Sequence, residues 1–354
     1  MNKNQEHVLV AALCWGLGHA TRCIPIIREL QLLGYVPVIA SDGVALDLLR
    51  KEFPEAIAVE LPAYNILYKL KHMFWNMAIQ DHKILRAAFL EHRAVQKLVQ
   101  QYAIKVIISD NRYGCFHPEA HNIFITHQLE IQIRPKFFQR LSNVLQRWAL
   151  KNFDEIWIPD LAETPGLAGQ LSHPDVAVHP NLRYVGPLSR MQKMQFDRSD
   201  QILVILSGPE PQRTIFEEIV LKAAMQSDLN WLIIRGIVHG MPPQVNNPKV
   251  KIINYLTAEA LNLELLQCAF LISRSGYSTI MDLAVTGAKA VLVPTPGQTE
   301  QEYLARLYAK GDIFMEMQQD AFDLQVIVEN IHKYSGIQHS PESLLKTAVA
   351  SIGR

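Results

Sequence analysis

Short apolar runs that alternate with segments of helical spacing are the feature that most constrains this chain. Residues 7–13, 36–40 and 106–109 are nearly continuous in apolar side chains rather than alternating with polar ones. Runs of this kind are typical of strands buried on both faces, and the helices between them indicate a parallel sheet covered on each side. The sequence therefore predicts an α/β fold.

The alternation occurs twice, with a break between the two sets. After residue 185 a Gly-Pro pair and the polar stretch 191–200 interrupt the pattern. Because 354 residues exceed a typical domain of about 100–200, we expect two Rossmann-like domains facing a cleft, residues 1–186 and 201–354, with a linker at 187–200. Ligands bind at the carboxyl ends of strands in such sheets, so the cleft is the expected active site. We allow for the final helix packing back on the first domain.

Composition excludes several classes of protein. Lys plus Arg and Asp plus Glu number 34 each, and the zero net charge argues against nucleic acid as a partner. With 49% hydrophobic and 19% charged residues the chain is not disordered. No apolar run reaches the roughly 18 residues of a membrane-spanning helix, and residues 8–15 are interpreted as a buried strand rather than a signal core. The four cysteines form no C-x-x-C pair, which predicts reduced thiols, no bound metal and a cytoplasmic protein.

A glycine-rich loop follows the first predicted strand. Gly16 and Gly18 allow a ligand to approach the backbone closely, and the helix start that follows favours an anion. The third glycine of a dinucleotide fingerprint is replaced by Thr21, which disfavours NAD as a cofactor. His19 lies at this strand-to-helix turn, and its ordinary pKa near 6.5 suits a general base. From spacing alone, a helix-capping or structural histidine fits equally well.

The strongest motif begins after the predicted strand 270–273. Small hydroxyl residues and a glycine at a helix start form a cradle for phosphate, and Asp282, one turn later, is a candidate ligand for ribose hydroxyls. Ordinary N-capping by Ser275 or Ser278 explains each residue singly but not the whole series.

That series resembles the nucleotide-sugar motif of GT-B glycosyltransferases. The likeness is closest to family 28, which includes the bacterial N-acetylglucosaminyltransferase of peptidoglycan-precursor synthesis, and the two-domain layout matches along nearly the whole chain. The loop from Gly16 to His19 is similar to the acceptor-side glycine loop of the same group. The residues that carry the C-terminal likeness are Arg274-Ser275-Gly276-x-Ser278-Thr279-x-x-Asp282, then Gly287, Pro294 and Gln301.

The resemblance implies a donor site in the second domain. Asp282 stands where the family has a Glu that binds ribose, and Gln301 matches a Gln that contacts the donor sugar. Ala305 replaces a family Asn, which leaves the donor sugar open. Arg213 could compensate for the missing glycines of the family's diphosphate loop, or be a solvated helix-start residue. The donor-binding candidates are Ser207, Gly208, Arg213, Arg274, Ser275, Gly276, Ser278, Thr279, Asp282 and Gln301.

The same resemblance implies transfer of a sugar from a nucleotide diphosphate, with UDP favoured, to an acceptor hydroxyl with inversion. His19 would be the base, and Asp110, at the end of another strand, would assist it or remain a turn residue. The sequence has no Asp-x-Asp, so we expect the helix start at 275–279 to stabilise the leaving group without metal. Closure about the linker would exclude water. The acceptor-side candidates are Gly16, Gly18, Arg22, Asn111 and His127.

A basic region suggests where the acceptor comes from. Residues 67–151 contain 13 Lys and Arg against 5 Asp and Glu. Basic amphipathic segments can lie on anionic membranes, which fits a lipid-linked or cell-envelope acceptor and a peripheral position on the inner face of the cytoplasmic membrane. A small-molecule acceptor stays open as the alternative. For the helix predicted at 134–151 we favour the alternative, a core-facing apolar side with basic side chains reaching solvent. The aromatic residues of 64–79 are expected to be exposed.

Two other functions remain open. A nucleotide-sugar 2-epimerase shares the GT-B layout but needs no acceptor, so the basic region would be unexplained. A non-catalytic protein that binds sugar nucleotides would have no turnover to lose when His19 is replaced.

Overall fold

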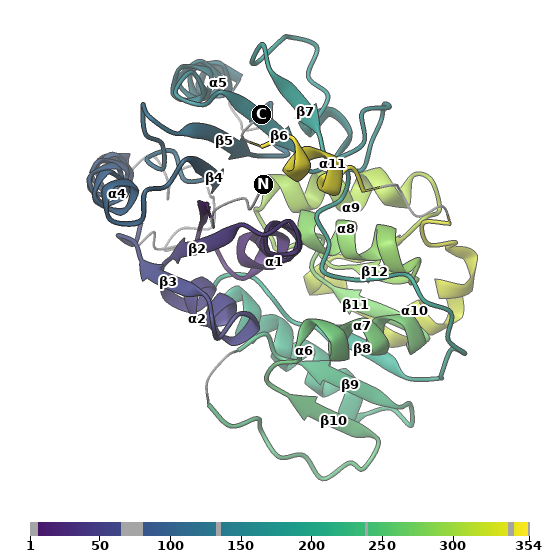
Figure 1. Ribbon diagram of the computed structural model, residues 1–354. Helices are drawn as coiled ribbons and strands as arrows, with labels where there is room; N and C mark the ends of the chain where they lie inside the picture. The colour runs from purple at the N-terminus through teal and green to yellow at the C-terminus, as the bar shows by residue number, and fades with distance from the viewer. Residues whose placement is uncertain (1–5, 65–80, 132–135, 238–239, 339–342, 353–354) are drawn as a thin grey trace. The chain divides into compact units, whose positions relative to one another are not determined.

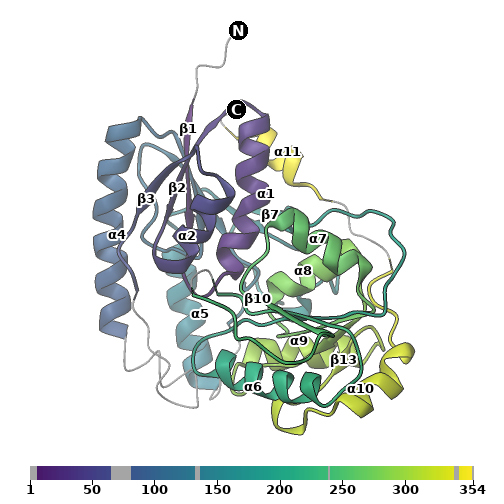
Figure 2. The same ribbon diagram turned by 90° about the horizontal axis from the view of Figure 1, so that it is seen from below.

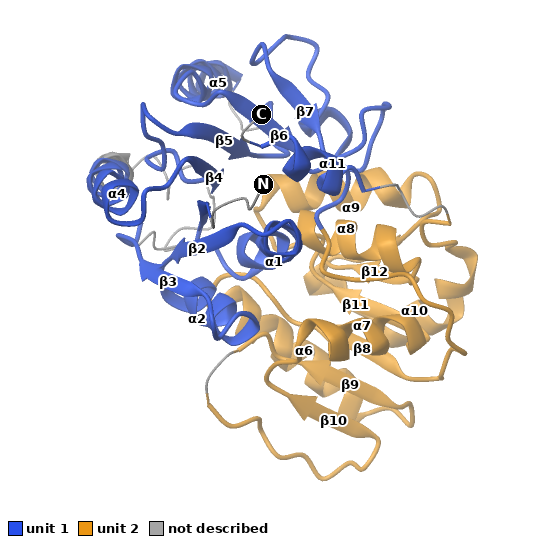
Figure 3. Ribbon diagram, viewed as in Figure 1, with its two compact units in different colours: residues 1–188, 342–354 blue, residues 189–341 orange. Residues whose placement is uncertain are grey.

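The computed structural model describes residues 6–64, 81–131, 136–237, 240–338 and 343–352. The chain divides into two compact units, one made of residues 1–188 and 342–354 and the other of residues 189–341 (Figure 3). Each unit holds one parallel β-sheet with helices packed on it (Figure 1). The α/β class predicted from the apolar runs is confirmed.

The sheet of the first unit has the strand order β3-β2-β1-β4-β5-β6-β7, with every neighbouring pair parallel. This order places the carboxyl ends of β1, β4 and β5 side by side. The strands are β1 His7–Ala12, β2 Val36–Ser41, β3 Ile57–Glu60, β4 Val106–Asp110, β5 His121–Ile125, β6 Glu155–Ile158 and β7 Leu182–Tyr184.

Helices cover both faces of this sheet. One face packs against α4, where Val95 and Leu98 meet Leu9 and Val38 of the strands. Figure 2 shows α1 on the side of β1–β3 opposite to α4. The C-terminal segment also belongs to this unit, since the Tyr35 hydroxyl donates to the Ile352 carbonyl at 3.0 Å. The helices are α1 Gly18–Leu32, α2 Gly43–Glu52, α4 Asp81–Tyr102, α5 Lys136–Leu150, the 3-10 turn η1 Gly169–Leu171 and α11 Leu345–Ala350.

The second unit has the strand order β10-β9-β8-β11-β12-β13, again parallel throughout. Phe216 and Val220 of α6 pack with Val204 and Ile272 of the sheet in one buried cluster, which Ile327 of α10 joins. The strands are β8 Ile202–Ile205, β9 Trp231–Ile234, β10 Val250–Ile253, β11 Phe270–Ser273, β12 Ala290–Leu292 and β13 Met315–Glu316. The helices are α6 Gln212–Met225, α7 Ala258–Gln267, α8 Tyr277–Thr286, α9 Thr299–Ala309, η2 Gln319–Ala321, α10 Leu324–Asn330 and η3 Ile331–Lys333.

The chain after residue 322 is helical only in part. Helix α10 forms there, but residues 334–338 are not helical. Gly336 has a φ of +71° and its N–H donates to the Ile313 carbonyl at 2.9 Å. A side chain at Gly336 would lie 3.0 Å from the Gly287 carbonyl oxygen, so close packing and not local spacing decides the backbone here.

Helix α5 contradicts the preferred interpretation that its apolar side faces the core. Its buried residues are Asn143, Gln146 and Leu150. Asn143 Oδ1 accepts a hydrogen bond from the Ile131 N–H at 2.8 Å, and Gln146 Nε2 donates to the Gln128 carbonyl at 2.7 Å. These amide bonds satisfy the loop after β5 and turn the polar side of the helix inward.

The apolar side of α5 consequently faces outward. The exposed fraction is 72% for Phe137 and 69% for Trp148. Leu141, Val144 and Leu145 are exposed on the same helix. The expectation that the aromatic residues of 64–79 are exposed is wrong for Tyr64, which is buried with its hydroxyl donating to Glu91 Oε2 at 2.9 Å. The other aromatic residues of that stretch lie outside the described residues. None of the helices in the described ranges combines the length and the hydropathy needed to cross a membrane.

Candidate active site in the first unit and donor loops in the second

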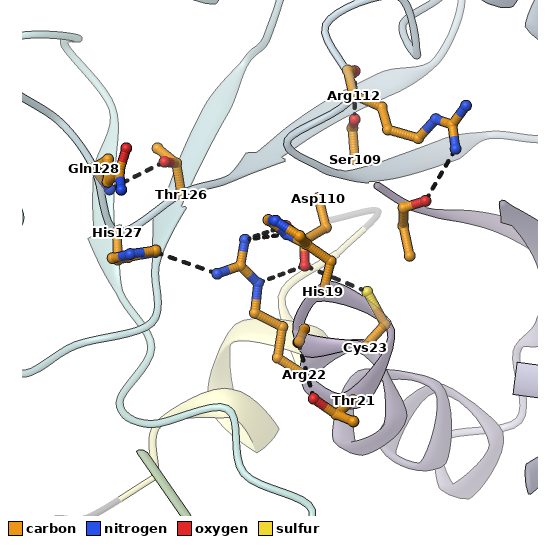
Figure 4. Close-up of polar contacts among 12 residues, drawn as sticks. His19, Thr21, Arg22, Cys23, Ser109, Asp110, Arg112, Thr126, His127 and Gln128 are labelled. Atoms are coloured by element: carbon orange, nitrogen blue, oxygen red, sulfur yellow. Dashed lines mark hydrogen bonds and ion pairs between the residues drawn. The ribbon is translucent and has the colours of Figure 1, made fainter. Parts of the chain in front are cut away.

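Side chains from two neighbouring loops of the first sheet meet at a buried carboxylate. Asp110 is the last residue of β4 and is fully buried, whereas His19 and Arg22 lie in the first turns of α1 after β1. Because β1 and β4 are paired neighbours, the residues that follow them share one edge of the sheet. The structure thus brings together His19, Asp110 and Arg22, which are separated by about ninety positions in the sequence (Figure 4).

The distances define a hydrogen-bonded cluster. His19 Nδ1 lies 2.9 Å from Asp110 Oδ1. Arg22 Nε donates to Asp110 Oδ2 at 2.5 Å, and its Nη2 also contacts Oδ1. The Arg22 guanidinium therefore grips both carboxylate oxygens, the strong two-point geometry of an arginine–carboxylate pair. The thiol of Cys23 reaches Asp110 Oδ2 at 3.6 Å, a contact that sequence analysis missed.

The protonation states follow from these neighbours. Burial opposes the charge on Asp110, but the Arg22 guanidinium and His19 hold the pKa of that carboxyl well below its usual value. Burial lowers the pKa of His19 from its ordinary value, Arg22 lowers it further, and the Asp110 charge opposes both. Lying where its side chain retains 16% exposure, His19 is a neutral imidazole at pH 7 with one nitrogen against Asp110. Its Nε2 has no hydrogen-bond partner among the described residues.

His127, from the loop after β5, completes the cluster. Its Nδ1 lies 3.2 Å from Arg22 Nη1. Arginine can only donate, so Nδ1 accepts and the ring carries its proton on Nε2. Asn111 follows Asp110 with a φ of +55°, a left-handed turn that Asn tolerates.

The two glycines of the loop lie beside this cluster. Gly16 is exposed, has a φ of +80° and has open space where a side chain would be. Gly18 is the first residue of α1, and its carbonyl accepts the Thr21 hydroxyl at 2.9 Å. The loop thus offers bare backbone within two residues of His19.

In the second unit, the predicted phosphate cradle is the start of α8. Gly276 is the N-cap residue, provides no side-chain cap, and has open space where a side chain would be. Ser275 is buried and its hydroxyl donates to the Gln301 carbonyl at 2.8 Å, so Ser275 ties α8 to α9 rather than capping the helix. Ser278 and Thr279 lie half-buried in the first turn. A helix start without a capping side chain is a ready anion site.

Asp282 and Gln301 lie at the two ends of this region. Burial raises the pKa of Asp282 to about 6, and its Oδ1 accepts the Ser189 hydroxyl at 2.5 Å. Gln301 Oε1 accepts the Thr295 N–H at 2.8 Å. Thr295 in turn lies against Gly208, since its hydroxyl oxygen is 3.6 Å from where a Gly208 side chain would begin. Sequence analysis did not single out Ser189 or Thr295, because neither belongs to a motif.

Arg213 is held by two carboxylates at the start of α6. Its Nε donates to Glu210 Oε1 at 2.6 Å and its Nη1 to Glu217 Oε2 at 2.8 Å. Two carboxylates thus neutralise the guanidinium, which would have to leave one of them to reach a diphosphate. Ser207, in contrast, is exposed at the end of β8.

Arg274 is buried and connects the loop after β11 to the start of α6 and to η2. Its guanidinium donates to the Gln212 carbonyl at 2.9 Å and to Gln319 Oε1 at 2.6 Å, and it stacks over Phe216 with 4.3 Å to the ring centroid. Burial lowers the pKa of Arg274 to about 10. With 1% of its surface exposed, Arg274 holds the loop in place from behind.

Comparison with known proteins places this geometry in a family. Residues 204–348 match the model of the glycosyltransferase family 28 C-terminal domain. Every donor-site candidate, from Ser207 to Gln301, falls within that match. Residues 204–348 therefore carry a glycosyltransferase family 28 C-terminal domain, and the chain is a glycosyltransferase with the GT-B fold.

Individual proteins agree with this assignment. An uncharacterized glycosyltransferase of Methanosarcina mazei is 22% identical over 81% of this chain and 79% of its own length. The UDP-N-acetylglucosamine–N-acetylmuramyl-(pentapeptide) pyrophosphoryl-undecaprenol N-acetylglucosamine transferase of Methylobacterium nodulans is 36% identical over 23% of this chain and 22% of its own. The structure of MurG from Acinetobacter baumannii superposes with a TM-score of 0.58 at 15% identity, covering 98% of this chain and 99% of that one. His19 and Asp110 of the glycosyltransferase lie outside the matched domain, so their role rests on their geometry.

Proposed function

We propose that this glycosyltransferase moves a sugar from a nucleoside diphosphate, UDP in the first instance, to an acceptor hydroxyl with inversion. The observation that carries the proposal is the His19–Asp110 pair. A neutral imidazole whose Nδ1 lies 2.9 Å from a buried carboxylate can take a proton at Nε2 while Asp110 stabilises the imidazolium that forms.

The transfer is a single displacement. The acceptor O–H bond breaks, its proton goes to His19 Nε2, and the oxygen forms a bond to the anomeric carbon. The bond from that carbon to the phosphate oxygen breaks, and its electron pair leaves with the nucleoside diphosphate. One displacement at carbon inverts its configuration. The start of α8 supplies backbone N–H groups for the departing diphosphate, which supports a reaction that needs no metal.

Donor binding is assigned to the second unit. Gly276 and Gly208 offer backbone to the diphosphate, Asp282 accepts from ribose hydroxyls, and Gln301 contacts the sugar. The relative from Methylobacterium, whose name includes a UDP-sugar, supports uridine. Because ribose hydroxyls donate to an ionised carboxylate and the pKa of Asp282 is about 6, donor affinity should fall as the pH drops through 6.

The acceptor is proposed to be lipid-linked and presented at an anionic membrane surface. Helix α5 supports this, because its exposed apolar side, with Phe137 and Trp148, is unusual for a helix on a water-soluble surface. Beside that side, Lys136, Arg140 and Arg147 line a depression of about 450 Å³, and Arg147 Nε is buried with no hydrogen-bond partner among the described residues. An apolar stripe flanked by cations suits acyl chains next to acidic headgroups.

A donor screen tests the proposal. UDP-, GDP- and dTDP-sugars are added in turn and the melting temperature is followed; stabilisation by at least one of them is expected, and stabilisation by none would sink the assignment. Asp282→Asn should abolish the loss of donor affinity near pH 6. Release of free nucleotide only when acceptor is added would separate the transferase from a 2-epimerase or from a non-catalytic binding protein.

Vesicle sedimentation tests the surface on α5. Binding to phosphatidylglycerol vesicles but not to phosphatidylcholine vesicles is expected, and the double variant Phe137→Ser/Trp148→Ser should lose it. Leu32→Ser, on the exposed surface of α1, is the matched control. Equal binding by both variants would contradict the assignment.

A further inference from the structure

Arg22 has no counterpart in a simple histidine–carboxylate pair. It is 2% exposed and contacts three members of the cluster: both oxygens of Asp110, Nδ1 of His127 and Nδ1 of His19. The guanidinium is permanently charged, so it brings a full positive charge to hydrogen-bond distance of the proposed base.

The charge balance of the cluster follows directly. A carboxylate alone would favour protonation of a neighbouring imidazole, and the imidazolium would then be unable to accept a proton. Here the positive Arg22 and the negative Asp110 cancel, and Nδ1 of His127 lies 3.2 Å from Arg22 Nη1. His19 therefore faces an ion pair of zero net charge.

Two hydrogen bonds compete for Nδ1 of His19, and each goes with a different tautomer of the ring. His19 Nδ1 lies 2.9 Å from Asp110 Oδ1 and 2.9 Å from Arg22 Nη2, and one nitrogen can serve only one of them at a time. When Nδ1 carries the proton it donates to Asp110 and leaves Nε2 as a base. When Nδ1 accepts from Arg22, Nε2 carries the proton and cannot act as a base. Since Arg22 already donates to Asp110 through Nε, its grip on the carboxylate sets where Oδ1 lies for His19.

The geometry points to Arg22 as a positioning residue that neutralises the charge of Asp110 and so keeps His19 unprotonated and able to accept a proton. The inference rests on the proposed role of His19 as the base. The groups that face His19 are Asp110 from β4, Arg22 from its own helix and His127 from the loop after β5; burial and Arg22 both lower the pKa of His19.

The test is a nuclear magnetic resonance titration of the full-length protein labelled in its histidines, with the His19 signal assigned by its loss in His19→Asn. The pKa of His19 should rise from wild type to Arg22→Gln, with Arg22→Lys between them because a lysine restores the charge but not the two-point grip. Arg112→Lys is the matched control: this arginine is buried in the same unit and pairs with Glu91 and Asp42 instead, so the titration of His19 should not move. A pKa of His19 in Arg22→Gln equal to or below that of wild type would overturn the inference.

Activity gives a second readout. The acidic limb of the kcat/KM profile of Arg22→Gln should shift to higher pH, with a loss of about tenfold or more at pH 6 and recovery at high pH, because removal of a charge in contact moves a pKa by about one or more. A uniform loss at every pH would indicate a merely structural role and overturn the inference. If neither variant at position 22 folds, the pKa of His19 in the wild-type protein tests the inference. A value at or above about 6.5 would contradict the inference about Arg22. The titration needs no substrate, so it remains valid if no sugar donor is found.

Discussion

Two buried arginines flank the end of β4, and their surroundings differ in one respect that separates a reactive site from a structural one. Arg22 pairs with Asp110 and two imidazoles, one of which keeps a nitrogen without a partner among the described residues. Arg112, two residues beyond Asp110, pairs with Glu91 and with Asp42 at 2.7 Å.

In the second cluster the three nitrogens of the Arg112 guanidinium and both carboxylate oxygens of Glu91 have hydrogen-bond partners. Arg112 also donates to the carbonyl oxygens of Ala12 and Pro62, at 3.1 and 2.8 Å, and Glu91 Oε2 accepts from Tyr64 and from the Gly114 N–H at 2.9 Å each. The side chains of Glu91 and Arg112 are fully buried. A buried arginine–carboxylate pair is therefore not by itself evidence of an active site. The pair at Asp110 differs because it is hydrogen-bonded to the partly exposed, titratable ring of His19.

The largest effect is expected when the imidazole ring of His19 is removed. His19→Ala should lower kcat by about 10²–10⁴-fold, the usual contribution of a general base, with donor affinity unchanged because donor residues lie in the other unit. Steady-state kinetics with a UDP-sugar measures the change in kcat, and calorimetry measures the affinity for the donor. A variant with more than half the wild-type kcat would show that another group removes the proton.

Removing the guanidinium of the second cluster should instead affect stability. Arg112→Gln leaves Glu91 buried without its cation and should lower the free energy of unfolding by about 3–5 kcal/mol. Urea unfolding followed by tryptophan fluorescence measures it, with His19→Ala as the comparison, since a side chain with 16% exposure should cost far less. An equal decrease in the free energy of unfolding in Arg112→Gln and His19→Ala would contradict a mainly structural role for the second cluster.

The pH dependence of stability should differ between the clusters. Since the folded-state pKa of His19 is lowered, the unfolded chain binds its proton first as the pH falls through about 6.5, and the free energy of unfolding should decrease over that range. The lowered pKa of Asp110 acts with the same sign below about pH 4. Thermal unfolding of wild type and of His19→Asn at a series of pH values isolates the contribution of His19 near pH 6.5. The same pH dependence of the melting temperature in both proteins would refute the attribution to His19.

The smallest effect is expected at Asp42. Burial raises its pKa in spite of Arg112, so its charge is already disfavoured and an amide oxygen can accept the same hydrogen bond. Asp42→Asn should change the free energy of unfolding by less than about 1 kcal/mol. A loss as large as that of Arg112→Gln, in the same urea titration, would mean that the Asp42 charge matters to the cluster.

Much of the fold was predictable because strands buried on both faces leave a plain apolar signal. The strand predicted at 270–273 has the same bounds as β11. Strands β7 and β13 were missed, since they have only three and two residues. Helix α4 was also not predicted.

The site was predictable in its loops but not in its contacts. His19, Asp110 and His127 each follow a strand, so their shared sheet edge could be inferred once the strands were known. The pairing of Arg22 with Asp110 carries no sequence signal, because the spacing of 88 residues between them has no local meaning. Motif likeness singled out Arg213 and Arg274 as surface ligands, whereas the structure places both guanidiniums in internal contacts.

The sequence by itself determined two parallel sheets and the loops that could bear chemistry, because apolar periodicity and glycine spacing are local properties. Only the tertiary structure decided which charges meet and which way α5 turns. A helical pattern has an apolar and a polar side in either orientation, and the amide bonds of Asn143 and Gln146 to the loop after β5 turned the polar side inward. In the same way, the neighbouring positions of β1, β4 and β5 brought Arg22 to Asp110 and so set the charge that His19 meets.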